Sequence, residues 1–190
     1  MSRGVLLVLA GTSGAGKGTI GRRLREQHPD LGWSVSWTTR PPRPGEVPGV
    51  DYHFVTREDF EGLRDAGGFL ESFEVYGDLK GTPRQFVDDA LADGHDVMLE
   101  VDVNGALKVR EKIPDALLVF VRAPSRHEQR RRLEARAADG PEAIERRLAR
   151  AEAEEQVARS RFDAVIVNDD VDRATAELTA ILESRRSGPH

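Results

Sequence analysis

The feature that most constrains the fold is a glycine-rich segment that joins an apolar run to a helical pattern near the N-terminus. The run Val5–Ala10 predicts a strand, and a helix is expected after the segment, ending at about Gln27. Glycines leave room for backbone N–H groups to surround phosphate oxygens, while the helix directs its positive end at the same anion. A lysine in the segment suits the β- and γ-phosphates of a nucleotide. The flanking strand and helix disfavour a glycine turn with a chance lysine. The predicted phosphate-binding loop comprises Gly11, Thr12, Ser13, Gly14, Ala15, Gly16, Lys17, Gly18 and Thr19.

The hydroxyl that commonly follows the lysine of such a loop is displaced by one position. Gly18 occupies the usual place, and Thr19 carries the hydroxyl. A Mg²⁺ ion accompanying the nucleotide is therefore expected to be bound through water, by Thr19 or by Asp102, which follows the apolar run Val97–Val101. Asp102 could equally cap the next helix. Glu100 lies within the apolar run and needs a partner, for which a ligand is one candidate.

Apolar runs alternate with helical patterns along most of the chain, which predicts an α/β fold with a mostly parallel, buried sheet. Further strands are expected at Val97–Val101, Ala116–Val121 and Ala164–Val167, and helices at Ala106–Lys112, Ser125–Ala135, Ile144–Arg159 and Asp172–Arg185. The segment from Ser34 to Asp93 breaks this rhythm with a proline- and glycine-rich opening. Within it we expect strands at Tyr52–Val55 and Phe69–Tyr76, a helix at Arg57–Ala66, and Pro83 in the first turn of another helix. We interpret this segment as an insertion on the α/β core.

Composition narrows the function classes. A length of 190 residues predicts one domain, and 28 basic against 33 acidic residues argue against an extended nucleic-acid surface. The absence of cysteine excludes disulfides, thiolate metal sites and cysteine nucleophiles, and it fits a reducing cytoplasm. No apolar run approaches the roughly 20 residues of a membrane-spanning helix. We therefore expect a cytoplasmic protein with neither nucleic acid nor a membrane as partner.

Several motifs resemble those of guanylate kinases. They are Ser34-Val-Ser-Trp-Thr-Thr-Arg-Pro-Pro-Arg-Pro-Gly-Glu46, Gly49-Val-Asp-Tyr-His-Phe54, Phe69-Leu-Glu71, Gly81-Thr82, Leu99-Glu-Val-Asp102, the arginine-rich stretch Arg130–Arg147 and Val165-Ile-Val-Asn-Asp-Asp170. They follow the family's order over roughly residues 4–183. The resemblance implies a single domain with a P-loop kinase core (1–33, 94–134 and 160–186), a GMP-binding insertion (about 34–93) and a helical lid (about 135–159).

The resemblance also implies how GMP is bound. Arg40, Arg43 and Tyr52 match positions that hold its phosphate, a role for which the planar fork of arginine is suited. Glu71 and Glu100 match positions that recognise guanine, whose N1–H and N2–H₂ groups donate to carboxylates. Adenine would leave these acceptors unpaired, at a cost of about 1–3 kcal/mol each. Ser36 and Thr82 match hydroxyl positions that contact the nucleotide.

Other positions concern ATP and the lid. Asn168 matches a position near the adenine of ATP, although it could equally cap the helix that follows. Arg136 and Arg147 match lid arginines, which would lay positive charge along the transferring group. Most other arginines of this region, including Arg130, Arg131 and Arg150, are expected on solvated helix faces beside glutamates.

Two departures from the family pattern stand out. Leu79-Lys80 occupies the place of a tyrosine pair, so Lys80 either replaces a tyrosine contact to the acceptor phosphate or leaves it unmade. Ala137-Ala138 replaces a Gly-Thr of the lid. Both departures bear on rate and affinity more than on the class of reaction.

The implied reaction is Mg²⁺-dependent transfer of the γ-phosphoryl group of ATP to GMP, with dGMP as a further candidate acceptor, in purine nucleotide metabolism. The attacking phosphate oxygen is already anionic, so positioning and charge from Lys17, Arg40, Arg136 and Arg147 would suffice. Two alternatives are a monophosphate kinase of another base specificity and a non-catalytic binding module, the latter disfavoured by the intact loop lysine. A third alternative is a GTPase, because Asp102-Val-Asn-Gly105 fits the pattern D-x-x-G. A GTPase would also need an N-K-x-D motif to recognise the base, and the chain has no Asn-Lys pair. The pattern does not distinguish a monomer from a homo-oligomer.

Overall fold

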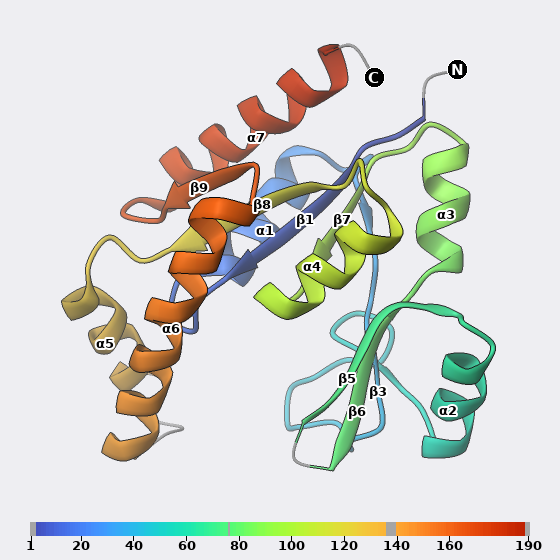
Figure 1. The fold of residues 1–190 in the computed structure, drawn as a ribbon, viewed down its shortest axis with the longest axis horizontal. Helices are drawn as coiled ribbons and strands as arrows, with labels where there is room; N and C mark the ends of the chain where they lie inside the picture. Colours follow the sequence, from blue (N-terminus) through green and yellow to red (C-terminus); the bar gives the residue numbers. More distant parts are fainter. Residues whose placement is uncertain (1–2, 76, 136–139, 189–190) are drawn as a thin grey trace.

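A five-stranded parallel sheet forms the centre of the molecule (Figure 1). The structure, a computed structural model, describes residues 3–75, 77–135 and 140–188. The sheet has the order β2-β7-β1-β8-β9, and all its pairs are parallel. Its strands are β1 (Leu6–Gly11), β2 (Gly32–Trp33), β7 (Val97–Glu100), β8 (Leu117–Arg122) and β9 (Ala164–Val167). The predicted α/β fold with a parallel sheet is confirmed.

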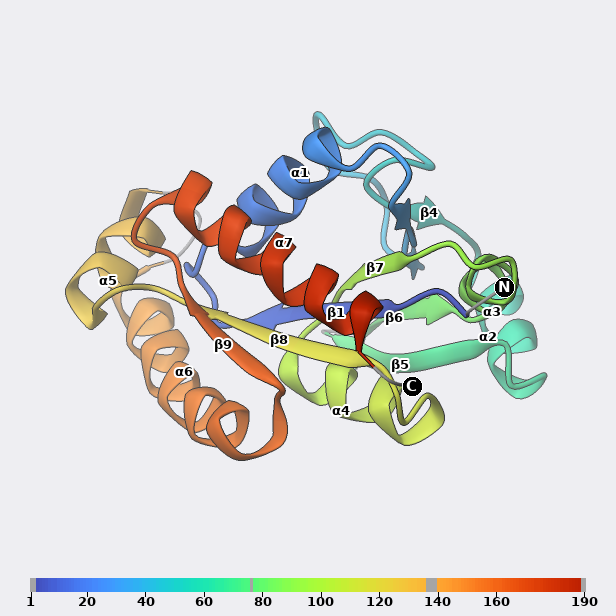
Figure 2. The same ribbon diagram turned by 90° about the horizontal axis from the view of Figure 1, so that it is seen from above.

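Helices cover both faces of this sheet (Figure 2). On one face lie α1 (Lys17–Gln27) and α7 (Val171–Ser187); on the other lie α3 (Gln85–Ala92), α4 (Val103–Lys112) and α6 (Pro141–Arg161). Every residue of β1 is buried: Leu7 and Leu9 join the core beneath α1 and α7, while Leu6 and Val8 join the core beneath α3 and α4. Burial on both faces explains why β1 is a continuous apolar run without alternation.

Helices α5 (Arg126–Ala135) and α6 pack side by side beyond the end of the sheet (Figure 1). They enclose a small core of Leu133, Ile144 and Leu148. Arg136 and the Ala137-Ala138 pair lie outside the described residues. Among the described ranges, no helix has the length and apolar character required to cross a membrane.

The segment that interrupts the strand–helix rhythm forms a second sheet of order β4-β3-β6-β5 (Figure 1). Its elements are β3 (Trp37–Thr38), β4 (His53–Phe54), β5 (Phe69–Val75), β6 (Asp78–Pro83) and the helix α2 (Arg57–Asp65). Phe60, Phe69 and Leu79 form its own small core. The expected strands at β4 and β5 and the expected helix at α2 are confirmed.

The expectation for Pro83 is wrong, and three strands are not predicted from the sequence. Pro83 is the last residue of β6, opposite Phe69, instead of the first turn of a helix, and α3 begins only at Gln85. A proline is tolerated there because strand ends need no ladder N–H. The sequence pattern predicts neither β6, which contains Lys80-Gly81, nor β2 and β3, which have two residues each.

Candidate functional site

One group of the predicted site residues lies where the strands of the parallel sheet end. The carboxyl ends of β1, β7, β8 and β9 meet at one edge, the usual ligand-binding edge of such sheets. The glycine-rich loop follows β1, Asp102 follows β7, α5 follows β8 and Asn168 follows β9. The fold therefore brings three segments that are distant in sequence to the edge at which the glycine-rich loop lies.

Backbone geometry explains the glycines of the loop. Gly14 and Gly16 have φ angles of 82° and 83°, in the left-handed region that favours glycine. A Cβ on Gly16 would lie 2.3 Å from Nδ2 of Asn168, and one on Gly11 would lie 2.3 Å from the carbonyl oxygen of Val121. Gly16 is the N-cap of α1 and has no side chain to cap it, so the helix N-terminus is open to an anion.

The loop is braced through the carbonyl oxygen of Ala15. This oxygen accepts hydrogen bonds from Nδ2 of Asn168 at 2.7 Å and from Nη1 of Arg132 at 3.3 Å. Nη2 of Arg132 also donates to the carbonyl of Asn168 at 3.0 Å. The capping alternative for Asn168 is wrong, because Asp170 caps α7 by accepting from the N–H of Arg173. The sequence did not single out Arg132, since a run of three arginines gives no signal for the one that faces the loop.

Helices α5 and α6 each contact Ser13 of the loop. Nε2 of Gln129 donates to the carbonyl of Ser13 at 2.8 Å, and Nη1 of Arg147 donates to its hydroxyl at 2.9 Å. Arg147 thus lies against the loop. Arg130 and Arg131 pair with Glu145 and Glu128 on exposed helix faces, as expected.

The two acidic positions after β7 face different partners. Oε1 of Glu100 lies 3.6 Å from Nζ of Lys17, with the two side chains 28% and 21% exposed respectively. Asp102 caps α4, its Oδ1 accepting from the N–H of Gly105 at 2.7 Å, and its Oδ2 lies 3.5 Å from Nη2 of Arg150. The capping interpretation of Asp102 is therefore confirmed. Glu100 pairs with Lys17, and Arg150 contacts Asp102 in addition to Glu154.

The donor atoms suit a cation that is bound mainly by its nucleotide. Among residues 3–75, 77–135 and 140–188, no three His, Asp or Glu side chains form a group able to hold a metal ion. Thr19 is exposed in the first turn of α1, and only Oδ2 of Asp102 is free of the helix cap. Mg²⁺ keeps several waters and takes one or two protein ligands beside phosphate oxygens, so this sparse set fits it.

On the second sheet, Glu71 and Thr82 lie opposite each other in β5 and β6. Both are 1% exposed, and the Thr82 hydroxyl donates to Oε1 of Glu71 at 2.6 Å. Within the described part of the chain, Oε2 of Glu71 is buried without a hydrogen-bond partner. Burial raises the pKa of the Glu71 carboxyl, an effect that the Thr82 bond opposes and the charge of Asp102 reinforces. A buried acceptor oxygen without a partner is costly, so it is positioned for a ligand that donates.

A second cluster surrounds Tyr52. Arg40 donates from Nη1 and Nη2 to the two carboxylate oxygens of Glu46, at 2.7 and 2.6 Å. The guanidinium carbon of Arg40 lies 5.0 Å from the centre of the Tyr52 ring, and Nζ of Lys80 donates to the Tyr52 hydroxyl at 3.2 Å. Bonds from Arg40 and from the backbone N–H of Arg43 lower the pKa of Glu46 to about 2. The sequence did not assign Glu46 a role, because a glutamate in a proline-rich loop gives no sign of its partner.

The remaining predicted residues lie nearby in the chain. The Arg43 side chain is exposed on the loop between β3 and β4, and Ser36, 8% exposed, lies in the short link between β2 and β3. A cavity of about 1030 Å³ lies elsewhere, at the amino ends of β1, β8 and β9 beside α7. None of the predicted site residues that the structure describes lines that cavity.

Comparisons with known proteins agree with this geometry. The family model described as guanylate kinase matches residues 3–185. A guanylate kinase of Rubrobacter xylanophilus is 52% identical over 182 residues, covering 96% of this chain and 95% of its own. One of Symbiobacterium thermophilum is 50% identical over 186 residues, covering 97% and 87%. The crystal structure of guanylate kinase from Anaplasma phagocytophilum superposes with a TM-score of 0.79 at 33% identity, over 99% of this chain and 89% of that one.

Proposed function

The chain belongs to the guanylate kinase family, and we propose that it transfers the γ-phosphoryl group of ATP to GMP, yielding ADP and GDP, with dGMP as a further acceptor. The observation that carries the choice of base is the buried, unpaired Oε2 of Glu71. Guanine offers N1–H and N2–H₂ as donors to such an acceptor, whereas the N1 of adenine only accepts. The Thr82 hydroxyl holds the carboxylate in place from the other side.

The geometry favours different roles for Glu71 and Glu100. Oε2 of Glu71 and Oδ1 of Asp102 lie 3.4 and 3.3 Å from the point where a Cβ on Gly105 would stand, so these two carboxylates are neighbours. We assign Glu71 to the guanine end. Glu100 was expected at the base, but its contact with Lys17 favours a role in orienting that lysine at the phosphate end.

At the donor end, backbone N–H groups of the loop and the N-terminus of α1 would bind the ATP phosphates. Lys17 leaves its long contact with Glu100 to reach the transferring group, and Arg147 adds charge from α6. Asn168 and Arg132 fix the carbonyl of Ala15, which keeps the loop in its binding conformation. Arg136 completes the lid in this proposal.

At the acceptor end, Arg40, Arg43, Tyr52 and Lys80 would bind the GMP phosphate, and Ser36 would contact the nucleotide. Arg40 is already oriented by Glu46 and by the Tyr52 ring. Because the attacking oxygen is anionic, no general base is needed, and catalysis comes from alignment and charge. Residues 34–93 act as the GMP-binding part and residues 135–159 as the lid, which together exclude water.

Mg²⁺ belongs to the proposal, with Thr19 and Asp102 holding it directly or through water. When bound, the ion neutralises negative charge on the β- and γ-phosphates. A cytoplasmic location, with access to ATP and nucleoside monophosphates, is likewise part of the proposal.

The test is the release of ADP, in a coupled assay, with GMP, dGMP, AMP, CMP and UMP as acceptors. We expect kcat/KM for GMP to exceed that for AMP by about 100-fold or more, since hydrogen-bonding sites reject analogues that leave them unpaired. Equal turnover of AMP and GMP would refute the guanine assignment. No turnover of any acceptor would favour a binding module.

A further inference from the structure

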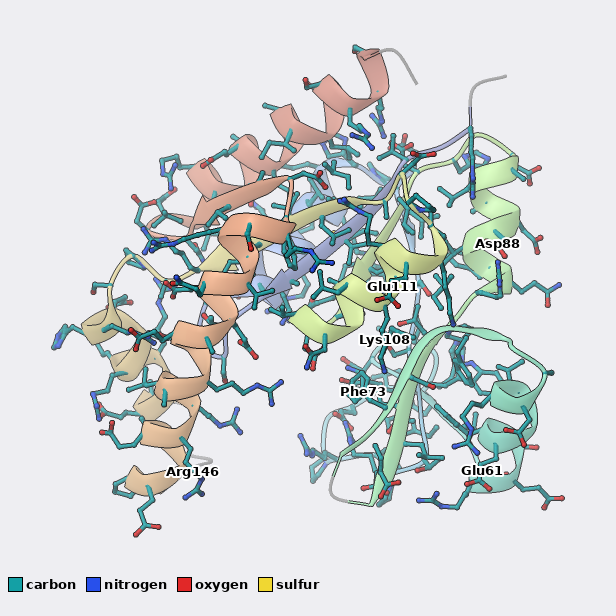
Figure 3. All side chains as sticks on the ribbon, in the orientation of Figure 1. Glu61, Phe73, Asp88, Lys108, Glu111 and Arg146 are labelled. Atoms are coloured by element: carbon teal, nitrogen blue, oxygen red, sulfur yellow. The ribbon has the colours of Figure 1, made fainter. Side chains whose placement is uncertain are left out.

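Helix α4 presents one of its sides to β5, the edge strand of the second sheet. In the order β4-β3-β6-β5, one edge of β5 has no neighbouring strand among the residues that the structure describes, and α4 packs against β5. Gly105, Lys108 and Lys112 are spaced three and four residues apart, so they lie on the same side of α4. Figure 3 shows Lys108 extending from α4 toward the second sheet, where Phe73 of β5 lies.

Both lysines donate to backbone carbonyls of β5. Nζ of Lys112 lies 2.7 Å from the carbonyl oxygen of Phe69, and Nζ of Lys108 lies 3.3 Å from that of Ser72. Between these two anchored carbonyls lies Glu71, whose Oε2 is close to Gly105 at the start of the same helix side. Four of the 28 basic residues of the chain are lysines, at positions 17, 80, 108 and 112, and two of these four form this pair.

The anchored segment contains an irregularity in the strand pairing. Phe69 pairs with Pro83 and Glu71 pairs with Thr82, so Leu70 is an additional residue in β5, as in a β-bulge. Leu70 is fully buried in the core beneath α3 and α4, whereas Phe69 belongs to the core of the second sheet. Segment 69–72 therefore joins the two cores and carries the carboxylate that faces the base.

We propose that Lys108 and Lys112 are positioning residues, which fix the backbone on either side of Leu70 and so aim the Glu71 carboxylate at the acceptor base. This inference rests on the proposed function. A bulge leaves a strand with fewer ladder hydrogen bonds, and the two ammonium groups supply bonds from outside the sheet. Both lysines are exposed residues, so replacing them removes these bonds without opening a cavity in either core.

The test compares Lys112→Met, Lys108→Met and the double variant with the wild-type chain. Lys112→Arg retains a donor, and Glu111→Gln changes an exposed neighbour on the same helix as a matched control. The measurements are kcat, the KM for GMP and for ATP, the thermal midpoint, and turnover of IMP. IMP keeps the N1–H of guanine but lacks the 2-amino group, so the GMP-to-IMP preference reports the placement of Glu71.

We expect Lys112→Met to raise the KM for GMP about 3- to 10-fold, the range that one hydrogen bond supports. Lys108→Met, which loses a longer bond, should raise it less, and the double variant more than either. The GMP-to-IMP preference should fall in the same variants, while kcat, the KM for ATP and the thermal midpoint stay near wild-type values. Lys112→Arg should recover most of the loss, and Glu111→Gln should show none.

Two results would overturn the inference. One is an unchanged KM for GMP and an unchanged preference in the double variant. The other is a parallel rise of both KM values with a lowered thermal midpoint, which would show a purely structural role. The proposed function fails separately, and already with the wild-type chain, if that chain does not prefer GMP to AMP.

Discussion

The two ends of the candidate site are built in different ways. At the phosphate loop, side chains from α5 and from the end of β9 bind backbone carbonyls of Ser13 and Ala15. At the acceptor end, side chains bind one another: Thr82 with Glu71, Lys80 with Tyr52 and Arg40 with Glu46. Backbone geometry thus defines the donor end, whereas side-chain identity defines the acceptor end. Substitutions at the acceptor end should therefore change selectivity, and substitutions of the loop lysine should change rate.

The largest effect is expected at the donor end, for Lys17→Met. Removing the charge that meets the transferring group should lower kcat by about 100- to 1000-fold, as for other preorganised charge-stabilising donors. The KM for GMP should stay within a few-fold of the wild-type value, because Lys17 contacts Glu100 and not the acceptor cluster. Single-turnover and steady-state kinetics measure both quantities. A kcat close to that of the wild-type chain would remove Lys17 from the mechanism.

The next effect concerns the buried carboxylate, in Glu71→Gln. Glutamine can still accept from Thr82, but its NH₂ group opposes the donors of guanine, so kcat/KM for GMP should fall about 30- to 100-fold. The variant should be no less stable than the wild-type chain, since it removes a charge whose burial raises its pKa. The acceptor panel together with thermal unfolding tests both points. If kcat/KM falls equally for every acceptor while the KM for ATP is unchanged, Glu71 does not select the base.

A pH profile of the KM for GMP distinguishes the contribution of Glu71 from that of Glu46. Glu71 must be ionised to accept from guanine, and burial raises its pKa, so the KM for GMP should rise as the pH is lowered through that pKa, by up to about 10-fold per unit below it. Glu46, with a pKa of about 2, stays ionised throughout this range. The effect of pH on stability runs the other way. Because the native state binds the Glu71 proton more tightly than the unfolded state does, the free energy of unfolding rises as the pH falls. Falling pH therefore favours the free fold and disfavours GMP binding.

The control for the pH profile is Glu71→Gln, which lacks the titrating group. Its KM for GMP should be high and should not change over the acidic range in which that of the wild-type chain rises. If the variant retains the same acidic rise, the titrating group lies elsewhere.

The smallest effect is expected for Lys80→Ala. The ammonium group lies on the Tyr52 hydroxyl, so its loss should raise the KM for GMP a few-fold and leave that for ATP unchanged, as for a partly solvated charge contact. Lys80→Tyr, which places the residue type of the family pattern at this position, should restore most of the affinity. Equal small effects on both substrates would make Lys80 a surface residue.

The same contrast explains what could be predicted from the sequence. Strands β1, β7 and β8 are recognisable because burial on both faces turns them into apolar runs. The edge strand β9 is recognisable as an apolar run although Val165 is exposed. The loop is recognisable because phosphate binding needs glycines at fixed spacing. Strand β6 contains Asp78, Gly81 and Pro83, residue types that are common in turns, so its sequence resembles that of a loop. Its neighbour β3 is too short to produce any pattern.

The site shows the same limit of sequence-based reasoning. Glu100 and Asp102 are two residues apart, which on one strand would place them on the same face. The strand ends at Glu100 and Asp102 caps α4, so the two carboxylates face Lys17 and Gly105 instead. The roles of Arg132, Gln129 and Glu46 depend on contacts between segments distant in sequence or on loop geometry, which residue spacing does not encode.

The additional residue at Leu70 links the register of β5 to both stability and base recognition. A one-residue slip of β5 would turn Leu70 out of the core beneath α4 and move Glu71 away from Thr82 in the same step. A misregistered molecule would therefore be both unstable and unable to recognise its acceptor, with no stable intermediate form of relaxed specificity. Selection for thermostable variants of this chain would then retain this strand register, because a slip that moves Glu71 away from Thr82 also takes Leu70 out of the core.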